Sequence, residues 1–136
     1  MAFVHGKSAV FKLDDSGGTL RDISAYLEQI GFPQPVEVAE TTTFGKSAKT
    51  YITGLKDSSV SLSGKWDSTL DGYVAPTLGQ AATLSFEYGP AGSTGGLIKY
   101  SGECIVTSFE VSAGVGDVVS VSIDLQVTDA VTRGTW

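Results

Sequence analysis

The chain has 136 residues, 41% hydrophobic and 18% charged, which fits one globular domain with a buried core and excludes a disordered tail. Its net charge of −6, with only nine Lys and Arg, argues against a surface that grips nucleic-acid phosphates. No apolar run is long enough to cross a bilayer, and the first residues lack a secretory signal pattern, so we expect a cytoplasmic protein without membrane insertion.

The first third of the chain is predicted to contain mainly strands. After a short N-terminal arm, residues 7–14 are expected to form a strand that a polar turn closes. Apolar residues at helical spacing favour a helix over residues 20–30, with a turn leading into a strand as the competing interpretation. Residues 36–44 are expected to form a further strand. No repeat or linker divides the chain, so we expect a single β domain over residues 1–136.

A long loop is predicted over residues 44–56. It carries three of the nine basic residues, and long loops often carry interaction function. A basic loop in an acidic protein is a natural partner for an acidic patch on another copy; the alternative is a solvated loop with scattered lysines. The residues predicted to contact a neighbouring subunit are Phe44, Lys46, Lys49, Tyr51 and Lys56.

Three later segments alternate between apolar and polar residues with the strand period of two: residues 59–66, 83–88 and 119–128. The core residues predicted from the apolar positions are Trp66, Phe86, Ile123 and Leu125. Between the first two segments, residues 68–78 are predicted to form a short helix. Asp67 or Ser68 would cap its start and Gly79 would end it.

The segment before the last strand changes its alternation near residues 105–108. Cys104 and Val106 are apolar on one parity, whereas Phe109 and Val111 are apolar on the other. Such a change indicates a bulge or a sharp bend, as when one strand serves two sheets. A turn at residues 113–117 then joins this strand to the last one in a long hairpin.

No residue pattern predicts catalysis, a metal site or a cofactor. His5 is the only histidine and Cys104 the only cysteine, too few for a His–Cys metal site, and nothing near His5 would orient it as a base. We therefore expect no enzyme, and we interpret Cys104 as a small buried apolar residue. The predicted strands carry little charge or proline to guard sheet edges, which favours pairing with another subunit; a sandwich with edges covered by loops is the alternative.

Four segments together resemble the tail tube (major tail) proteins of long-tailed bacteriophages. They are residues 20–26 (LRDISAY), residues 41–45 (TTTFG) with the lysine-bearing loop after them, residues 60–67 (VSLSGKWD) and residues 131–135 (VTRGT). The resemblance covers nearly the whole chain. It implies a mostly-β fold, a two-sheet sandwich or barrel with one short flanking α-helix, and it replaces the helix at residues 20–30 with a turn and a strand.

The same resemblance implies a structural protein of the virion tail, assembled in the host cytoplasm. Six subunits would form a ring, the rings would stack into a tube with other tail proteins at its ends, and DNA would cross an acidic lumen in transit without specific binding. We expect some of four candidate carboxylates to face this lumen: Glu87, Glu103, Glu110 and Asp124. The alternatives are a related single-ring protein from a tail end or secretion tube, or a monomeric β-barrel that binds a small ligand.

Overall fold

The computed structural model describes residues 3–136, and most of the elements in it are strands. The strands are β1 (Val10–Asp14), β2 (Leu20–Asp22), β3 (Leu27–Gly31), β4 (Val36–Glu40), β5 (Tyr51–Lys56), β6 (Ser59–Lys65), β7 (Leu84–Gly89), β8 (Ile98–Ser112) and β9 (Ser120–Thr135). The helix α1 spans Ser68–Val74, and short 3-10 turns lie at Gly6–Ser8, Ser24–Tyr26 and Ala75–Thr77. The expected mostly-β fold with one short helix is confirmed.

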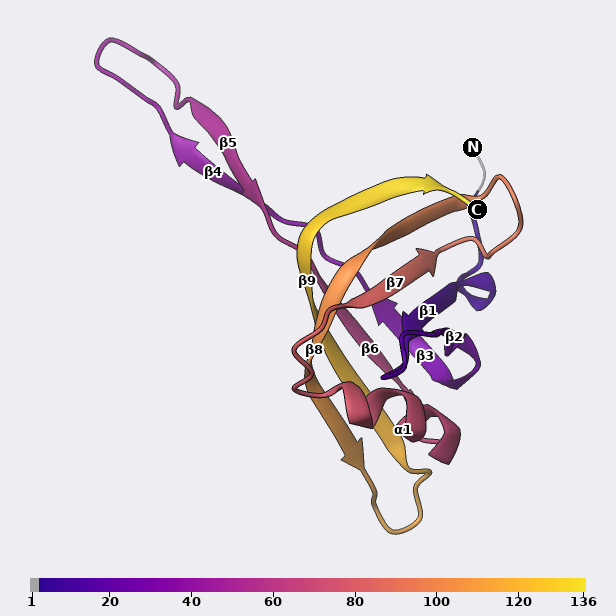
Figure 1. Cartoon of the computed structure of the whole chain (residues 1–136). Coiled ribbons are helices and arrows are strands. Elements are labelled where there is room, and N and C mark those ends of the chain that lie inside the picture. The colour runs from indigo at the N-terminus through magenta and orange to yellow at the C-terminus, as the bar shows by residue number, and fades with distance from the viewer. Residues whose placement is uncertain (1–2) are drawn as a thin grey trace.

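Seven strands form one antiparallel sheet in the order β2-β1-β7-β8-β9-β6-β3. The sheet curls, so that the two halves of the expected sandwich are parts of one surface, joined by the long strands β8 and β9 (Figure 1). The 3-10 turn between β2 and β3 closes the curl. There the hydroxyl of Ser24 accepts a 2.8 Å hydrogen bond from the backbone N–H of Phe11.

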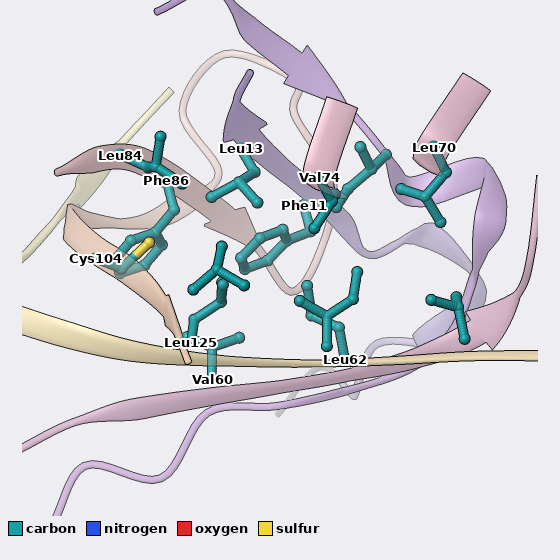
Figure 2. Close-up of a cluster of buried hydrophobic side chains, with 14 of the residues drawn as sticks. Phe11, Leu13, Val60, Leu62, Leu70, Val74, Leu84, Phe86, Cys104 and Leu125 are labelled. Atoms are coloured by element: carbon teal, nitrogen blue, oxygen red, sulfur yellow. The ribbon is translucent and has the colours of Figure 1, made fainter. Parts of the chain in front are cut away.

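The core lies inside this curl, and α1 contributes Leu70 and Val74 to it (Figure 2). Phe86 is 1% exposed and stacks on Phe11 with ring centroids 6.0 Å apart. The predicted core residues Ile123 and Leu125 are also buried.

The prediction that Trp66 belongs to the core is wrong, since this side chain is 36% exposed. It has the apolar parity of β6, but that strand ends at Lys65, before Trp66. Its indole N–H instead donates a 3.2 Å hydrogen bond to Asp71 on the first turn of α1.

Residues 20–30 form strand, turn and strand rather than a helix. The backbone where the 3-10 turn at Ser24–Tyr26 leads into β3 passes so close to Gly64 of β6 that a Cβ there would collide with the carbonyl of Tyr26. Glycine, which lacks a Cβ, is the residue that permits this approach.

The predicted helix is present, and its last turn is tighter than an α-helix. The carboxylate of Asp67 accepts a 2.8 Å hydrogen bond from the N–H of Thr69, which caps the start of α1. The 3-10 turn at Ala75–Thr77 contains Pro76, which cannot donate a backbone hydrogen bond. Gly79 follows with a φ of +80°, a conformation that glycine adopts without strain.

The change of parity predicted in β8 is confirmed as a bulge at Thr107. Val106 pairs with Leu125 and Ser108 with Asp124, so no residue of β9 lies opposite Thr107, whose hydroxyl donates a 3.1 Å hydrogen bond to the carbonyl of Asp124. A larger irregularity follows Thr128 in β9, where Asp129 adopts a positive φ of 67°. The predicted strand at residues 7–14 begins later, at Val10, because residues 6–8 form a 3-10 turn.

Candidate assembly surfaces

Strands β4 and β5 form a separate hairpin that projects away from the curled sheet (Figure 1). At its base, the N–H of Asp57 donates to the carbonyl of Pro35 at 3.0 Å. At its far end, the N–H of Thr41 donates to the carbonyl of Thr50 at 2.8 Å, and the hydroxyls of these two threonines lie 2.9 Å apart. The hairpin is therefore an ordered arm.

The loop predicted over residues 44–56 is partly wrong, because its second half is strand β5. Tyr51, Ile52 and Thr53 are aromatic or β-branched, and such residues favour strands. Strand β4 correspondingly ends at Glu40 instead of reaching Phe44. The threonines that follow bond across the loop; the hydroxyl of Thr42, for example, accepts from the N–H of Thr50 at 2.9 Å.

Both faces of the hairpin carry exposed apolar side chains. Val38 lies opposite Thr53, so it shares a face with Tyr51, whereas Ile52 lies on the other face. Leu55 is 77% exposed, Phe44 at the tip is fully exposed, and the remaining three are more than half exposed. Sequence reasoning missed Val38, Ile52 and Leu55. Their only signal is that apolar residues of β5 fall on both parities, as in a strand with no solvated face.

The three lysines of the hairpin are all exposed: Lys46, Lys49 and Lys56. None of them forms an ion pair within residues 3–136. Lys46 and Lys49 belong to the loop at the tip, and Lys56 ends β5, where it pairs with Val36. The hairpin thus combines apolar side chains with free positive charge in an otherwise acidic protein, and contact with a neighbouring subunit stays a prediction.

The four carboxylates proposed for a lumen lie on one face of the curled sheet, the outer face, opposite to the core. Residues directly opposite each other in an antiparallel pair share a face. Glu103 lies opposite Thr128 of β9, and Glu110 lies opposite Ser122. Asp124 has the same parity in β9. Glu87 has the same parity in β7 as Ser85, which lies opposite Glu103.

These carboxylates differ in their interactions with neighbouring side chains. Glu103 accepts hydrogen bonds from the hydroxyls of Ser85 at 2.6 Å and Thr83 at 3.1 Å. Glu87 lies 3.8 Å from the ammonium group of Lys99. Glu110 and Asp124 are exposed. The outer face therefore combines partly buried and exposed carboxylates among serines and threonines.

Trp136 lies on the same outer face, a placement that sequence reasoning missed. The ammonium groups of Lys12 and Lys99 both lie over its ring, each 5.1 Å from the centroid. These three residues come from β1, β8 and the residue after β9, which the sequence separates widely. No local pattern could have indicated the cluster.

The described residues offer no centre for metal or thiol chemistry. No three His, Cys, Asp or Glu side chains within residues 3–136 come together as a metal site would require. Burial, with smaller contributions from Glu103 and Asp14, raises the pKa of the Cys104 thiol to about 12. Because the thiolate is the reactive form, this cysteine is inert near neutral pH. No helix in this part of the chain is long and apolar enough to cross a membrane.

Several solved structures share the fold. The chain is similar to the tail protein of an empty gene transfer agent particle refined with C6 symmetry, at a TM-score of 0.82 and 16% identity, covering 97% of this chain and 99% of that one. It is similar to the SPP1 tail tube protein, at a TM-score of 0.76 and 15% identity, covering 98% and 80%. A chain of the anti-feeding prophage baseplate matches at a TM-score of 0.70 and 14% identity, covering 98% and 95%.

No curated protein matches the sequence. The family model described as phage tail tube protein, in contrast, matches residues 4–133, nearly the whole chain. The same span contains all of the curled sheet but the last two residues of β9, together with the projecting hairpin and the four carboxylates of the outer face. The chain belongs to the phage tail tube protein family and is a structural component of the virion.

Proposed function

We propose that six copies of this chain form a ring, that the rings stack into the tail tube, and that DNA passes through the lumen of that tube. The gene transfer agent tail to which the chain is similar was refined with C6 symmetry, which supports rings of six. Assembly in the host cytoplasm, with other tail proteins at the tube ends, belongs to the same proposal.

The observation that carries the proposal is the projecting hairpin. A lone subunit leaves Val38, Ile52 and Leu55 exposed to water on an arm that pairs with no other strand within residues 3–136. Burying such a side chain completely contributes about 1.5–3 kcal/mol, and a few of them offset much of the roughly 4–15 kcal/mol cost of association. We infer that the hairpin docks on a neighbouring subunit and that its free lysines set the orientation.

The edges of the curled sheet supply a second contact. Strands β2 and β3 are the two edge strands, and each has a neighbour on one side only. Unpaired backbone groups on an edge favour the addition of a strand from another chain. Pairing between neighbours in a ring would continue the sheet around the lumen.

The outer face of that continued sheet would then line the lumen. Carboxylates form no salt bridge with DNA phosphates. DNA that touches this surface would also release no bound counterions, so nothing would favour its adhesion to the lumen wall. Alternatively, these carboxylates would lie on the exterior of the tube, where their charge would favour solubility.

Electron microscopy of the concentrated protein tests the assembly. We expect tubes with six-fold symmetry, and we expect the hairpin variant Ile52→Ser/Leu55→Ser to remain folded and unassembled. Single rings would favour a protein of the tail end or of a secretion tube. Monomers at every concentration would reject self-assembly and favour the ligand-binding alternative.

A further inference from the structure

The indole of Trp136 stands on the outer face of the sheet, over Gly89 of β7. A Cβ added at Gly89 would collide with the carbonyl oxygen of Gly92, and it would lie 2.7 Å from the indole nitrogen and 2.9 Å from Cζ2 of Trp136. The absence of a side chain at this position therefore makes room for both the turn to Gly92 and the indole. Val10 lies opposite Gly89 in β1, so the ring sits at the end of the β1–β7 pairing.

Backbone hydrogen bonds fix Trp136 in this position. Its N–H donates to the carbonyl of Leu97 at 3.0 Å, and its own carbonyl accepts from the N–H of Gly96 at 3.3 Å. The indole nitrogen, in contrast, is buried without a hydrogen-bond partner in the described part of the chain. A buried donor without a partner is unfavourable, so hydrogen bonding by the indole does not account for its place on the sheet.

The ring instead engages two lysines. Lys12 belongs to β1 and Lys99 to β8, the two strands that flank β7, so the two side chains reach the ring from opposite sides of Gly89. A distance of 5.1 Å from the ring centroid is within the range of a cation–π interaction. Lys99 also approaches the carboxylate of Glu87 at 3.8 Å.

All three lysines in the strands of the curled sheet have a partner within the subunit. The third, Lys65, pairs with Glu28 at 3.2 Å. It lies opposite Ser120, on the same face as the carboxylates. The strand arginines, Arg21 and Arg133, lie opposite Leu13 and Tyr100, on the other face. The lysines without such a partner are those of the hairpin and Lys7 in the N-terminal 3-10 turn, whereas each of the three lysines in the strands of the outer sheet face has a partner inside the subunit.

We propose that Trp136 masks Lys12 and Lys99, so that the outer face presents carboxylates to a passing polyanion but no free ammonium group. A lysine held over an indole keeps its charge but loses the freedom to reach a phosphate. Two freed lysines would add two phosphate contacts per subunit and steepen the salt dependence of DNA adhesion by about 1.8 in the log–log slope. This inference rests on the proposed function, because it matters only if this face lines the lumen.

Amine acetylation of the unassembled, full-length subunit tests the masking without DNA. Mass spectrometry would follow each lysine, with Lys46 and Lys49 as exposed references. We expect Lys12 and Lys99 to react several-fold more slowly than the references, and to approach their rate in Trp136→Leu, which keeps an apolar cover but removes the π face. Trp66→Leu is the matched control, since that indole donates to Asp71. Equal rates in wild type and Trp136→Leu would overturn the masking.

DNA ejection from particles that carry Trp136→Leu tests whether the masking of these lysines affects DNA passage. We expect Trp136→Leu tubes to assemble, to eject DNA incompletely at low salt, and to recover when Lys12→Gln/Lys99→Gln is added. Lysines that become reactive while ejection stays normal at every salt concentration would reject the placement of this face in the lumen. If Trp136→Leu fails to fold, the double variant Lys12→Gln/Lys99→Gln of the otherwise wild-type chain provides the test. If Trp136 masks both lysines, their removal should leave DNA ejection unchanged. Faster ejection at low salt would overturn the proposal.

Discussion

Glu103 and Glu110 lie on the same face of β8, although strict alternation would place them on opposite faces. Thr107 causes this, because it is the unpaired residue of a bulge, and every residue after it changes face. Glu103 lies opposite Thr128 and Glu110 opposite Ser122, two residues of equal parity in β9. One inserted residue therefore brings the carboxylates of both halves of β8 onto a common surface.

Charge reversal on this surface should impair DNA delivery without impairing assembly. We expect Glu103→Lys, Glu110→Lys, Asp124→Lys and Glu87→Lys, made one at a time, to give normal tubes with slowed or incomplete ejection, because each adds an adhesive cation to every subunit. Glu110→Gln is the matched control and should have a smaller effect. Tubes that deliver DNA at the wild-type rate with any one of these lysines would count against the lumen assignment.

Charge reversal in the hairpin should have the opposite outcome. The double variant Lys46→Glu/Lys49→Glu should lose polymerisation, whereas its free energy of unfolding should change by less than about 0.5 kcal/mol, because both lysines are exposed and form no ion pair. Sedimentation would measure assembly and chemical denaturation would measure stability. Lys46→Arg/Lys49→Arg, which keeps the charge, should polymerise. A normal tube yield from the glutamate variant would show that these lysines are not in the contact.

Truncation of Phe86 should be among the most costly core substitutions. The ring is buried against Phe11 and Phe32, with centroids 6.0 and 5.7 Å away, so Phe86→Ala should destabilise the subunit by about 3–5 kcal/mol. The half-exposed Trp66 serves as a comparison: Trp66→Ala should cost less, since it loses partial burial and one hydrogen bond of about 1 kcal/mol. Denaturant midpoints of the unassembled subunits measure both. A loss below about 1 kcal/mol for Phe86→Ala would contradict its place in the core.

Cys104 should not react with thiol reagents in the folded protein. Because burial raises its pKa to about 12, the thiol is almost entirely protonated near neutral pH, and the side chain is also buried. At about pH 8, near the ordinary thiol pKa, we expect modification of the native subunit to follow its slow unfolding, and rapid modification in concentrated guanidinium. Fast reaction of the native protein would show that the β7–β8 pairing opens readily.

The sequence predicts best those elements in which one face is buried and the other is solvated. Residues 119–128 alternate without interruption, and the structure places Val121, Ile123, Leu125 and Val127 in the core. The bulge in β8 was predictable because its parity changes between two buried stretches. Helix α1 was predictable from its cap at Asp67 and its stop at Gly79.

The elements that sequence analysis missed depend on distant contacts or on surfaces without a partner. Strand β5 is apolar on both parities because neither of its faces packs against the core, so alternation could not identify it. Trp66 was misplaced because parity does not indicate where a strand ends. The cluster of Trp136 with Lys12 and Lys99 depends on strand order, which the local pattern does not determine.

The length of the hairpin has a mechanical consequence. From Val36 to the tip near Gly45, about nine residues at roughly 3.3 Å each give an arm of about 30 Å. A folded domain of this size has a radius of gyration of about 14 Å, so the arm is nearly as long as the subunit is wide. In the proposed ring, an arm of that reach would extend past the boundary between two subunits and onto the body of the next. Bending a tube braced in this way would strain many arms at once, so the tube would resist shear between its subunits even where each single contact is weak.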